Sequence, residues 1–129
     1  MYHKAKGPRK LQVAESRVPG GGYGVFAKYP IQRGETLEVA PFIEVPSKFV
    51  FNHGPNLLQN YVFTSHCKPG HVLVVFGYGS MYNHSIDNQN VYYRIGQNRK
   101  RFLDFVALKD IPAGVELLIN YGPAHPVNR

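Results

Sequence analysis

The chain has 129 residues, a formal net charge of +7 and a hydrophobic fraction of 43%. This length predicts one domain, and the apolar fraction predicts a packed core rather than a disordered chain. No apolar run approaches the roughly 18 residues of a membrane helix, and the N-terminus lacks a signal peptide's apolar segment, so we expect neither. Because Cys67 is the only cysteine, an internal disulfide and a cysteine-rich zinc cluster are excluded.

Composition divides the chain into three segments. Residues 1–10 are basic and contain glycine and proline, which predicts a flexible lead. Residues 11–122 are predicted to form one domain, and residues 123–129 a short C-terminal tail. The basic lead and the positive residues near Arg94 and Arg101 form a surface that is either simply solvated or able to attract the phosphates of DNA.

Short runs rich in β-branched and aromatic residues, separated by turn residues, predict strands throughout the domain. In chain order they are Leu11–Ala14, Gly24–Lys28, Thr36–Ala40, Tyr61–Thr64, Val72–Phe76, Asn90–Ile95, Phe102–Leu108 and Glu116–Asn120. Helix signals are poor, and only Asn56–Asn60 is predicted to make a helical turn. The pattern predicts a mostly β domain of several small sheets.

Two stretches of the chain resemble each other. Residues 26–37 and 106–117 both read as a strand, an Ile-x-x-Gly turn and a second strand. Glycine supplies the positive φ that such a turn often needs. We expect two similar hairpins, one at each end of the domain.

Three motifs are candidates for chemistry. The cluster Gly20-Gly21-Gly22-Tyr23-Gly24 is either an ordinary turn or a loop whose backbone approaches a ligand; its spacing excludes a dinucleotide-binding loop. Asn83-His84-Ser85 is either a turn or a ligand-binding segment, because Asn offers a donor and an acceptor and His can stack and donate. Tyr121, at the end of Glu116–Gly122, is either a core tyrosine or a functional phenol. His66, Cys67 and His71 match no common zinc pattern, so we expect no metal.

Taken together and in this order, the motifs resemble those of the SET-domain protein lysine methyltransferases, most closely the compact viral and bacterial single-domain members. Tyr61-Val62-Phe63 resembles a mid-domain strand of that family, and residues 83–90 resemble its N-H-S-x-x-P-N segment, with Gln89 in place of proline and one extra residue. The resemblance covers about residues 11–122. It implies a fold of small curled sheets with a C-terminal pseudoknot and few short helices.

The resemblance also implies a donor and a set of site residues. The donor is S-adenosylmethionine, with the backbone of Gly22, Tyr23 and Gly24 on its methionine part and Asn83 and His84 on its amino group and adenine side. Tyr121 is the implied catalytic residue. The implied substrate channel has Tyr61, Tyr93 and Ile119 in its walls, with Tyr23 and Tyr92 as further candidates. Ile119 occupies a position where the family often has Phe or Tyr, which predicts di- or trimethylation.

The substrate implied is a lysine in a protein tail, a histone by family precedent, which predicts a nuclear location; another protein substrate would leave a cytoplasmic location open. The basic surface suits contact with nucleosomal DNA, and Glu38, Glu44 and Asp87 are candidates to line a groove for a basic peptide. Residues 123–129 lack the cysteines that bind zinc after many SET domains, so we expect another element to cover the site, and a homodimer that completes it is an open alternative. Two other functions also stay open: a non-catalytic SET-like module that binds peptide or nucleic acid, and a small β-barrel that binds nucleic acid.

Overall fold

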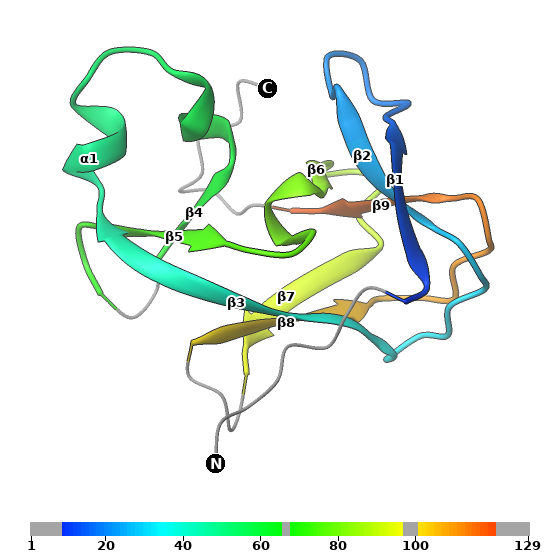
Figure 1. Cartoon of the computed structure of the whole chain (residues 1–129). Coiled ribbons are helices and arrows are strands. Elements are labelled where there is room, and N and C mark those ends of the chain that lie inside the picture. The colour runs from blue at the N-terminus through cyan, green and yellow to red at the C-terminus, as the bar shows by residue number, and fades with distance from the viewer. Residues whose placement is uncertain (1–8, 66–67, 97–100, 121–129) are drawn as a thin grey trace.

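The computed structural model describes residues 9–65, 68–96 and 101–120. Strands dominate these residues and form two small sheets, with short helices at their edges (Figure 1). The predicted mostly β fold of small curled sheets with few short helices is confirmed. Within these ranges no helix is both long and apolar enough to cross a membrane.

The smaller sheet has four strands in the order β1-β2-β9-β6. Its members are β1 (Leu11–Glu15), β2 (Tyr23–Ala27), β9 (Glu116–Ile119) and β6 (Asn83–His84). β1, β2 and β9 pair antiparallel, whereas β6 runs parallel to β9 with Asn83 opposite Leu118. The last strand of the domain therefore lies between the front of the chain and the segment around Asn83, as the predicted pseudoknot requires.

The larger sheet has five strands in the order β4-β5-β3-β8-β7. Its members are β4 (Val62–Thr64), β5 (His71–Val75), β3 (Thr36–Pro46), β8 (Phe102–Ala107) and β7 (Val91–Ile95). β3 is the long central strand, pairing first with β8 and then with β5 (Figure 1). The sequence predicted its end at Ala40. It continues because Pro41 still pairs with Phe102 of β8, and its carbonyl accepts a hydrogen bond from the Phe76 N–H at 2.9 Å on the β5 side.

The internal repeat is present, but the prediction of two separate hairpins is wrong. Each turn contains a glycine with positive φ, +84° at Gly34 and +86° at Gly114. The strands around each turn pair with the other repeat, β2 with β9 and β3 with β8. Ile31 and Ile111 join the two turns, each donating its N–H to the other's carbonyl at 2.8 Å. Hairpin and exchanged pairing use the same residues, so the local pattern could not distinguish them.

The helices are short connections. η1 (Leu57–Asn60) matches the predicted helical turn, whereas α1 (Lys48–Phe51) was not predicted. The four residues of α1 are too few to show a helical periodicity. η2 (Gly79–Met81) is one 3₁₀ turn that leads from β5 towards β6.

Both sheets contribute to one main hydrophobic core. Its aromatic centre contains Phe63, Tyr82 and Phe105, all fully or almost fully buried. Tyr82 stacks on Phe105 with ring centroids 4.7 Å apart, and Tyr93 meets Phe63 edge to face at 4.9 Å. This shared core fixes the two sheets against each other and so fixes the loops between them.

Candidate active site

Glu116, the first residue of β9, has a buried carboxylate, with only 7% of the residue exposed. The Ser16 hydroxyl and the Asn83 amide donate to its Oε2 at 2.7 and 3.0 Å, and the Arg17 N–H donates to Oε1 at 3.0 Å. Both oxygens are therefore hydrogen-bonded, which is the condition for burying a carboxylate at low cost. Glu116 ties the β1–β2 loop and β6 to the C-terminal strand. The sequence showed only an acid at the head of a strand and did not reveal this role.

Asn83 is 2% exposed, and its Nδ2 donates two side-chain hydrogen bonds within the described part of the chain. One goes to Glu116 and the other to the carbonyl of Tyr23 at 3.1 Å. Gly24 follows Tyr23, and a Cβ there would clash with the Glu116 carboxylate and lie 3.0 Å from Asn83 Nδ2. Gly24 is thus required for packing within the protein, in addition to any approach of its backbone to a ligand.

Gly22 and Tyr23 sit on the exposed side of the same junction. Gly22 has a φ of +62° and open space where a Cβ would lie, and Tyr23 is 64% exposed. Both line a surface hollow of about 480 Å³ that is formed by residues 15–23. Of the predicted donor-binding residues in this loop, Gly22 and Tyr23 are therefore exposed to solvent, whereas Gly24 is buried.

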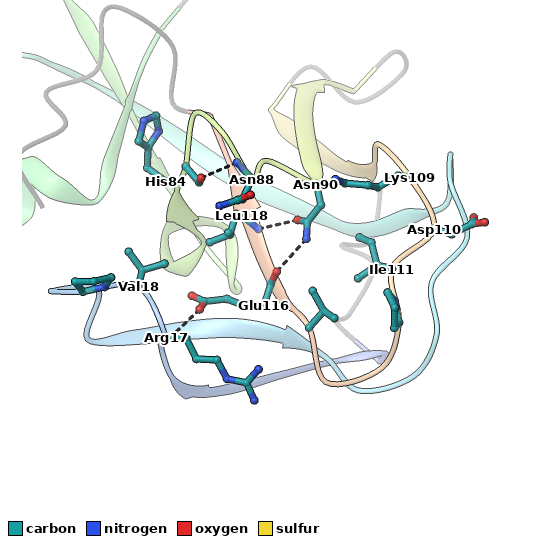
Figure 2. A pocket seen from close by; sticks show the side chains of 14 residues that line it. Arg17, Val18, His84, Asn88, Asn90, Lys109, Asp110, Ile111, Glu116 and Leu118 are labelled. Atoms are coloured by element: carbon teal, nitrogen blue, oxygen red, sulfur yellow. Dashed lines mark hydrogen bonds between the residues drawn. The ribbon is translucent and has the colours of Figure 1, made fainter.

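His84 lines a second cavity, of about 600 Å³. Figure 2 shows this cavity between the 83–90 segment, β9 and the turn around Asp110 and Ile111. It shares Arg17, Val18 and Pro19 with the first hollow. The structure thus brings Gly24 and Asn83 into direct contact, and places Gly22, Tyr23 and His84 around two neighbouring cavities.

The 83–90 segment holds β9 in place. Ser85 N–H donates to the carbonyl of Ile119 at 2.9 Å, and Asn90 N–H to that of Leu118 at 3.0 Å. The Asn90 side chain accepts from the Leu118 N–H at 2.8 Å and donates to the Glu116 carbonyl at 3.0 Å (Figure 2). The backbone and side chain of Asn90 therefore form hydrogen bonds to β9 like those of a neighbouring strand. Asn90 was recognised only as the last residue of the predicted N-H-S-x-x-P-N segment.

The predicted channel residues are only partly brought together. Tyr93 and Asn120 line a cavity of about 240 Å³ with Leu73, Gln89, Tyr92, Arg94, Ile95 and Leu103. Burial raises the pKa of the Tyr93 phenol above its ordinary value. Ile119 is fully buried in the main core, against which Tyr93 packs. Tyr61 is half-buried immediately before β4 and is not among the residues lining that cavity.

Tyr121, the predicted catalytic residue, lies outside the described residues, as do His66 and Cys67. Asn120, its neighbour, is half-buried at the end of β9. Among the described residues no group of three or more His, Cys, Asp and Glu is arranged to hold a metal ion. Of the acidic residues proposed for a peptide groove, Glu44 and Asp87 are exposed, but Glu38 is 2% exposed and cannot line a surface groove.

The arrangement can be compared with known proteins. A family model described as SET domain matches residues 22–122. The chain belongs to the SET-domain family. A curated relative from Schizosaccharomyces pombe, a histone-lysine N-methyltransferase specific for H3 lysine-37, is 34% identical over 103 residues, which make up 78% of this chain and 67% of the relative.

Solved structures agree with this SET-domain assignment. A Plasmodium falciparum protein provisionally assigned as a histone methyltransferase matches with a TM-score of 0.67 and 28% identity, covering 89% of this chain and 95% of that one. Chaetomium thermophilum polycomb repressive complex 2, autoinhibited and bound to S-adenosylmethionine, matches with a TM-score of 0.73 and 26% identity over 90% of this chain. This chain spans 15% of that complex's matching chain.

These matches confirm, at the level of the family, the predicted enzyme class, a protein-lysine N-methyltransferase, and the predicted donor, S-adenosylmethionine. The residues of this SET domain fit such a donor. Gly22 is exposed and leaves open space where a Cβ would lie, whereas Nδ2 of the buried Asn83 donates to Glu116 and to the Tyr23 carbonyl within the protein. A zwitterionic amino acid with an attached nucleoside needs such main-chain and amide groups.

Proposed function

We propose that this chain transfers methyl groups from S-adenosylmethionine to the amine of a lysine in a histone tail. The observation that carries the proposal is the junction at Asn83, where hydrogen bonds to Glu116 and to the Tyr23 carbonyl join the glycine loop, β6 and β9. These are the segments that contain the motifs of the SET-domain resemblance. The Schizosaccharomyces pombe relative supports a histone as the substrate.

The donor supplies a methyl group that is already activated by its sulfonium charge. The protein therefore has to align the amine, the methyl carbon and the sulfur. Binding both reactants in this alignment lowers the entropy cost of bringing them together in the reaction step. The backbone of Gly22 to Gly24 and the side chain of Asn83 would hold the methionine part, and His84 the adenine side. The two hydrogen bonds of Asn83 keep its amide in place before the donor binds.

The lysine must lose its proton to water before it can attack, since its ordinary pKa of about 10.4 leaves it charged at neutral pH. Its nitrogen would then form a bond to the methyl carbon as the bond from that carbon to sulfur breaks, and S-adenosylhomocysteine would leave. An apolar channel beside a positive sulfonium lowers that pKa. Tyr61 and Tyr93 are proposed as channel walls, with the cavity beside Tyr93 and Asn120 on the substrate side. Tyr121 is proposed to face the transferring methyl group, where its oxygen would stabilise the polarised hydrogens.

Ile119 bears on the number of methyl groups added. Its side chain has no hydroxyl to hold a water or an amine in one orientation, so a methylated lysine remains free to rotate for the next transfer. We therefore keep di- or trimethylation as the proposed product.

Several finer proposals concern partners and location. A histone substrate would place the protein in a nucleus, and the net charge of +7 would favour contact with nucleosomal DNA. A homodimer that completes the site remains a proposal. Residues 11–122 are proposed as the catalytic domain, with 1–10 as a basic lead and 123–129 as a tail.

The test is to incubate the protein with S-adenosylmethionine carrying a labelled methyl group and either core histones or a bacterial lysate, and to locate the label by mass spectrometry. Label on a histone lysine supports the proposal. Label on a lysate protein but not on histones supports the alternative of a non-histone substrate. Donor binding without any transfer supports a non-catalytic SET-like module instead.

A further inference from the structure

Glu38, on β3, is a buried carboxylate to which the proposed chemistry assigns no task. Only 2% of the residue is exposed. Its Oε1 accepts a hydrogen bond from the Tyr82 hydroxyl and its Oε2 one from the Tyr78 N–H, each at 2.8 Å. Gly77, with a φ of +68°, brings its backbone so close to Oε2 that a Cβ there would clash. The segment from Gly77 to Tyr82 is therefore wrapped around this carboxylate.

Tyr82 connects Glu38 to the proposed donor site, because it binds the Glu38 carboxylate and directly precedes Asn83. It is fully buried, and its ring stacks on Phe105 with centroids 4.7 Å apart and an interplanar angle of 28°. With the hydroxyl held by Glu38 and the ring held by Phe105, the position of its backbone is fixed. The next residue is Asn83, whose side chain bonds to Glu116 on the far side.

The segment that carries Asn83 is thus held between two buried carboxylates from different sheets. Glu38 belongs to the larger sheet and Glu116 to the smaller one. Removing either acceptor leaves a buried donor unsatisfied, which is costly and is relieved by moving the donor. Tyr78 and Tyr82 flank η2, which is a single turn, and Asn83 and His84 follow directly. A shift of Tyr78 or Tyr82 would therefore also move Asn83 and His84.

We propose that Glu38 is a positioning residue for donor binding, which acts by fixing Tyr78 and Tyr82 and thereby the place of Asn83 and His84. This inference rests on the proposed function, since it assumes that Asn83 and His84 bind the donor. Glu38 touches neither reactant, so its loss weakens donor binding more than it slows the transfer step. A purely structural role predicts a different result: fewer folded molecules, each with normal affinity.

The experiment measures the dissociation constant of S-adenosylmethionine by calorimetry for the wild type, Glu38→Gln, Tyr82→Phe and a control, Glu35→Gln. Glu35 lies three residues before Glu38 and accepts from the Gln32 N–H, with a salt bridge to Lys10 at 2.8 Å. Each test variant removes one hydrogen bond from the buried cluster and should raise the dissociation constant about tenfold, while the control stays within about twofold. Turnover at saturating donor should fall by less than that.

A second readout does not depend on activity. The side-chain amide signal of Asn83 in the nuclear magnetic resonance spectrum of the donor-free protein should shift in Glu38→Gln and in Tyr82→Phe, and not in Glu35→Gln. If Glu38→Gln does not fold, the test rests on Tyr82→Phe alone. This variant keeps the Glu38 carboxylate and removes only the Tyr82 hydroxyl that donates to it.

Normal donor affinity and an unchanged Asn83 signal in the folded variants would overturn the inference while leaving the proposed function intact. Absence of donor binding by the wild type would instead overturn the proposed function, so the two failures are distinguishable.

Discussion

Asn83 donates a hydrogen bond from Nδ2 to Oε2 of Glu116 at 3.0 Å, across 33 residues of sequence. The same amide also holds the Tyr23 carbonyl of β2. One side chain thus joins three segments that are distant in the sequence. The proposed donor site depends on this join, and so do the first two predictions.

Asn83→Asp should destabilise the protein by about 3 kcal/mol at neutral pH, because it removes both donated hydrogen bonds and places a second carboxylate against Glu116. The loss in free energy of unfolding is measured with urea at neutral pH. Asn83→Ala is the control, since it removes the same two hydrogen bonds without adding a charge beside Glu116 and should therefore cost less. Equal losses for the two variants would contradict the prediction.

Gly24→Ala should cost about 1–3 kcal/mol of stability, since the new Cβ clashes with the Glu116 carboxylate. The clash has a specific partner, so the cost should be smaller in a Glu116→Ala background. A double-mutant cycle with urea unfolding measures this coupling. Additive losses would mean that Gly24 is required for another reason, such as the path of the strand.

The positions of the strands could be predicted from the sequence, but the way in which the strands pair could not. The predicted strands lie close to the observed ones because alternation and turn residues are local signals. The exchange of strands between the two repeats around Ile31 and Ile111 has no local signal. The strand predicted over Thr36–Ala40 was too short, because its continuation through Pro41 to Pro46 depends on pairing with β8 and β5, which are distant in the sequence.

For the site, too, the sequence indicated the individual motifs but not the contacts between them. The motifs around Gly24, Asn83 and Glu116 were found in the sequence, but their mutual contacts were not, since only the fold brings them together. Glu38 was one of three candidates to line a peptide groove, and nothing local in the sequence indicates that it is buried. The structure buries it because Tyr78 and Tyr82 supply donors to both carboxylate oxygens. The tyrosine that gives the site its proposed chemistry, Tyr121, stays a prediction.

The pH dependence of stability should contain a contribution from Glu38. Burial raises the pKa of this carboxyl above its ordinary value of 4.5, although hydrogen bonds from Tyr78 and Tyr82 partly lower it. Burial, and then the charge of Glu38, raises the pKa of Tyr82 well above its ordinary value, so the phenol stays neutral in this range. A raised carboxyl pKa means that the folded state holds the proton more tightly than the unfolded chain does.

The stabilising contribution of Glu38 is therefore complete below pH 4.5 and is lost as the pH rises through the raised pKa. Urea unfolding of the wild type and of Glu38→Gln across this range should show the wild type losing stability relative to the variant as the pH increases. A constant difference between the two would show that Glu38 has the same pKa in both states.

Ile119→Tyr should change the product towards monomethyllysine, because a hydroxyl in the proposed channel would hold the amine or a water in one orientation. Mass spectrometry of a methylated substrate peptide measures the ratio of products. Ile119 is fully buried, so the larger ring should also cost about 1–3 kcal/mol and the folded fraction must be checked first. A wild type that makes only monomethyl product would contradict the premise, and Ile119→Leu should leave the product ratio unchanged.

The central claim is that Tyr121 acts on a methyl group delivered by S-adenosylmethionine at the junction of the glycine loop and Asn83. The most direct measurement compares turnover and donor affinity in Tyr121→Phe and the wild type. The account predicts a loss of turnover of about 100-fold or more with donor affinity retained within a few-fold, because the hydroxyl matters chiefly in the transition state. Full turnover by the variant, or no uptake of the donor by the wild type, would contradict the account.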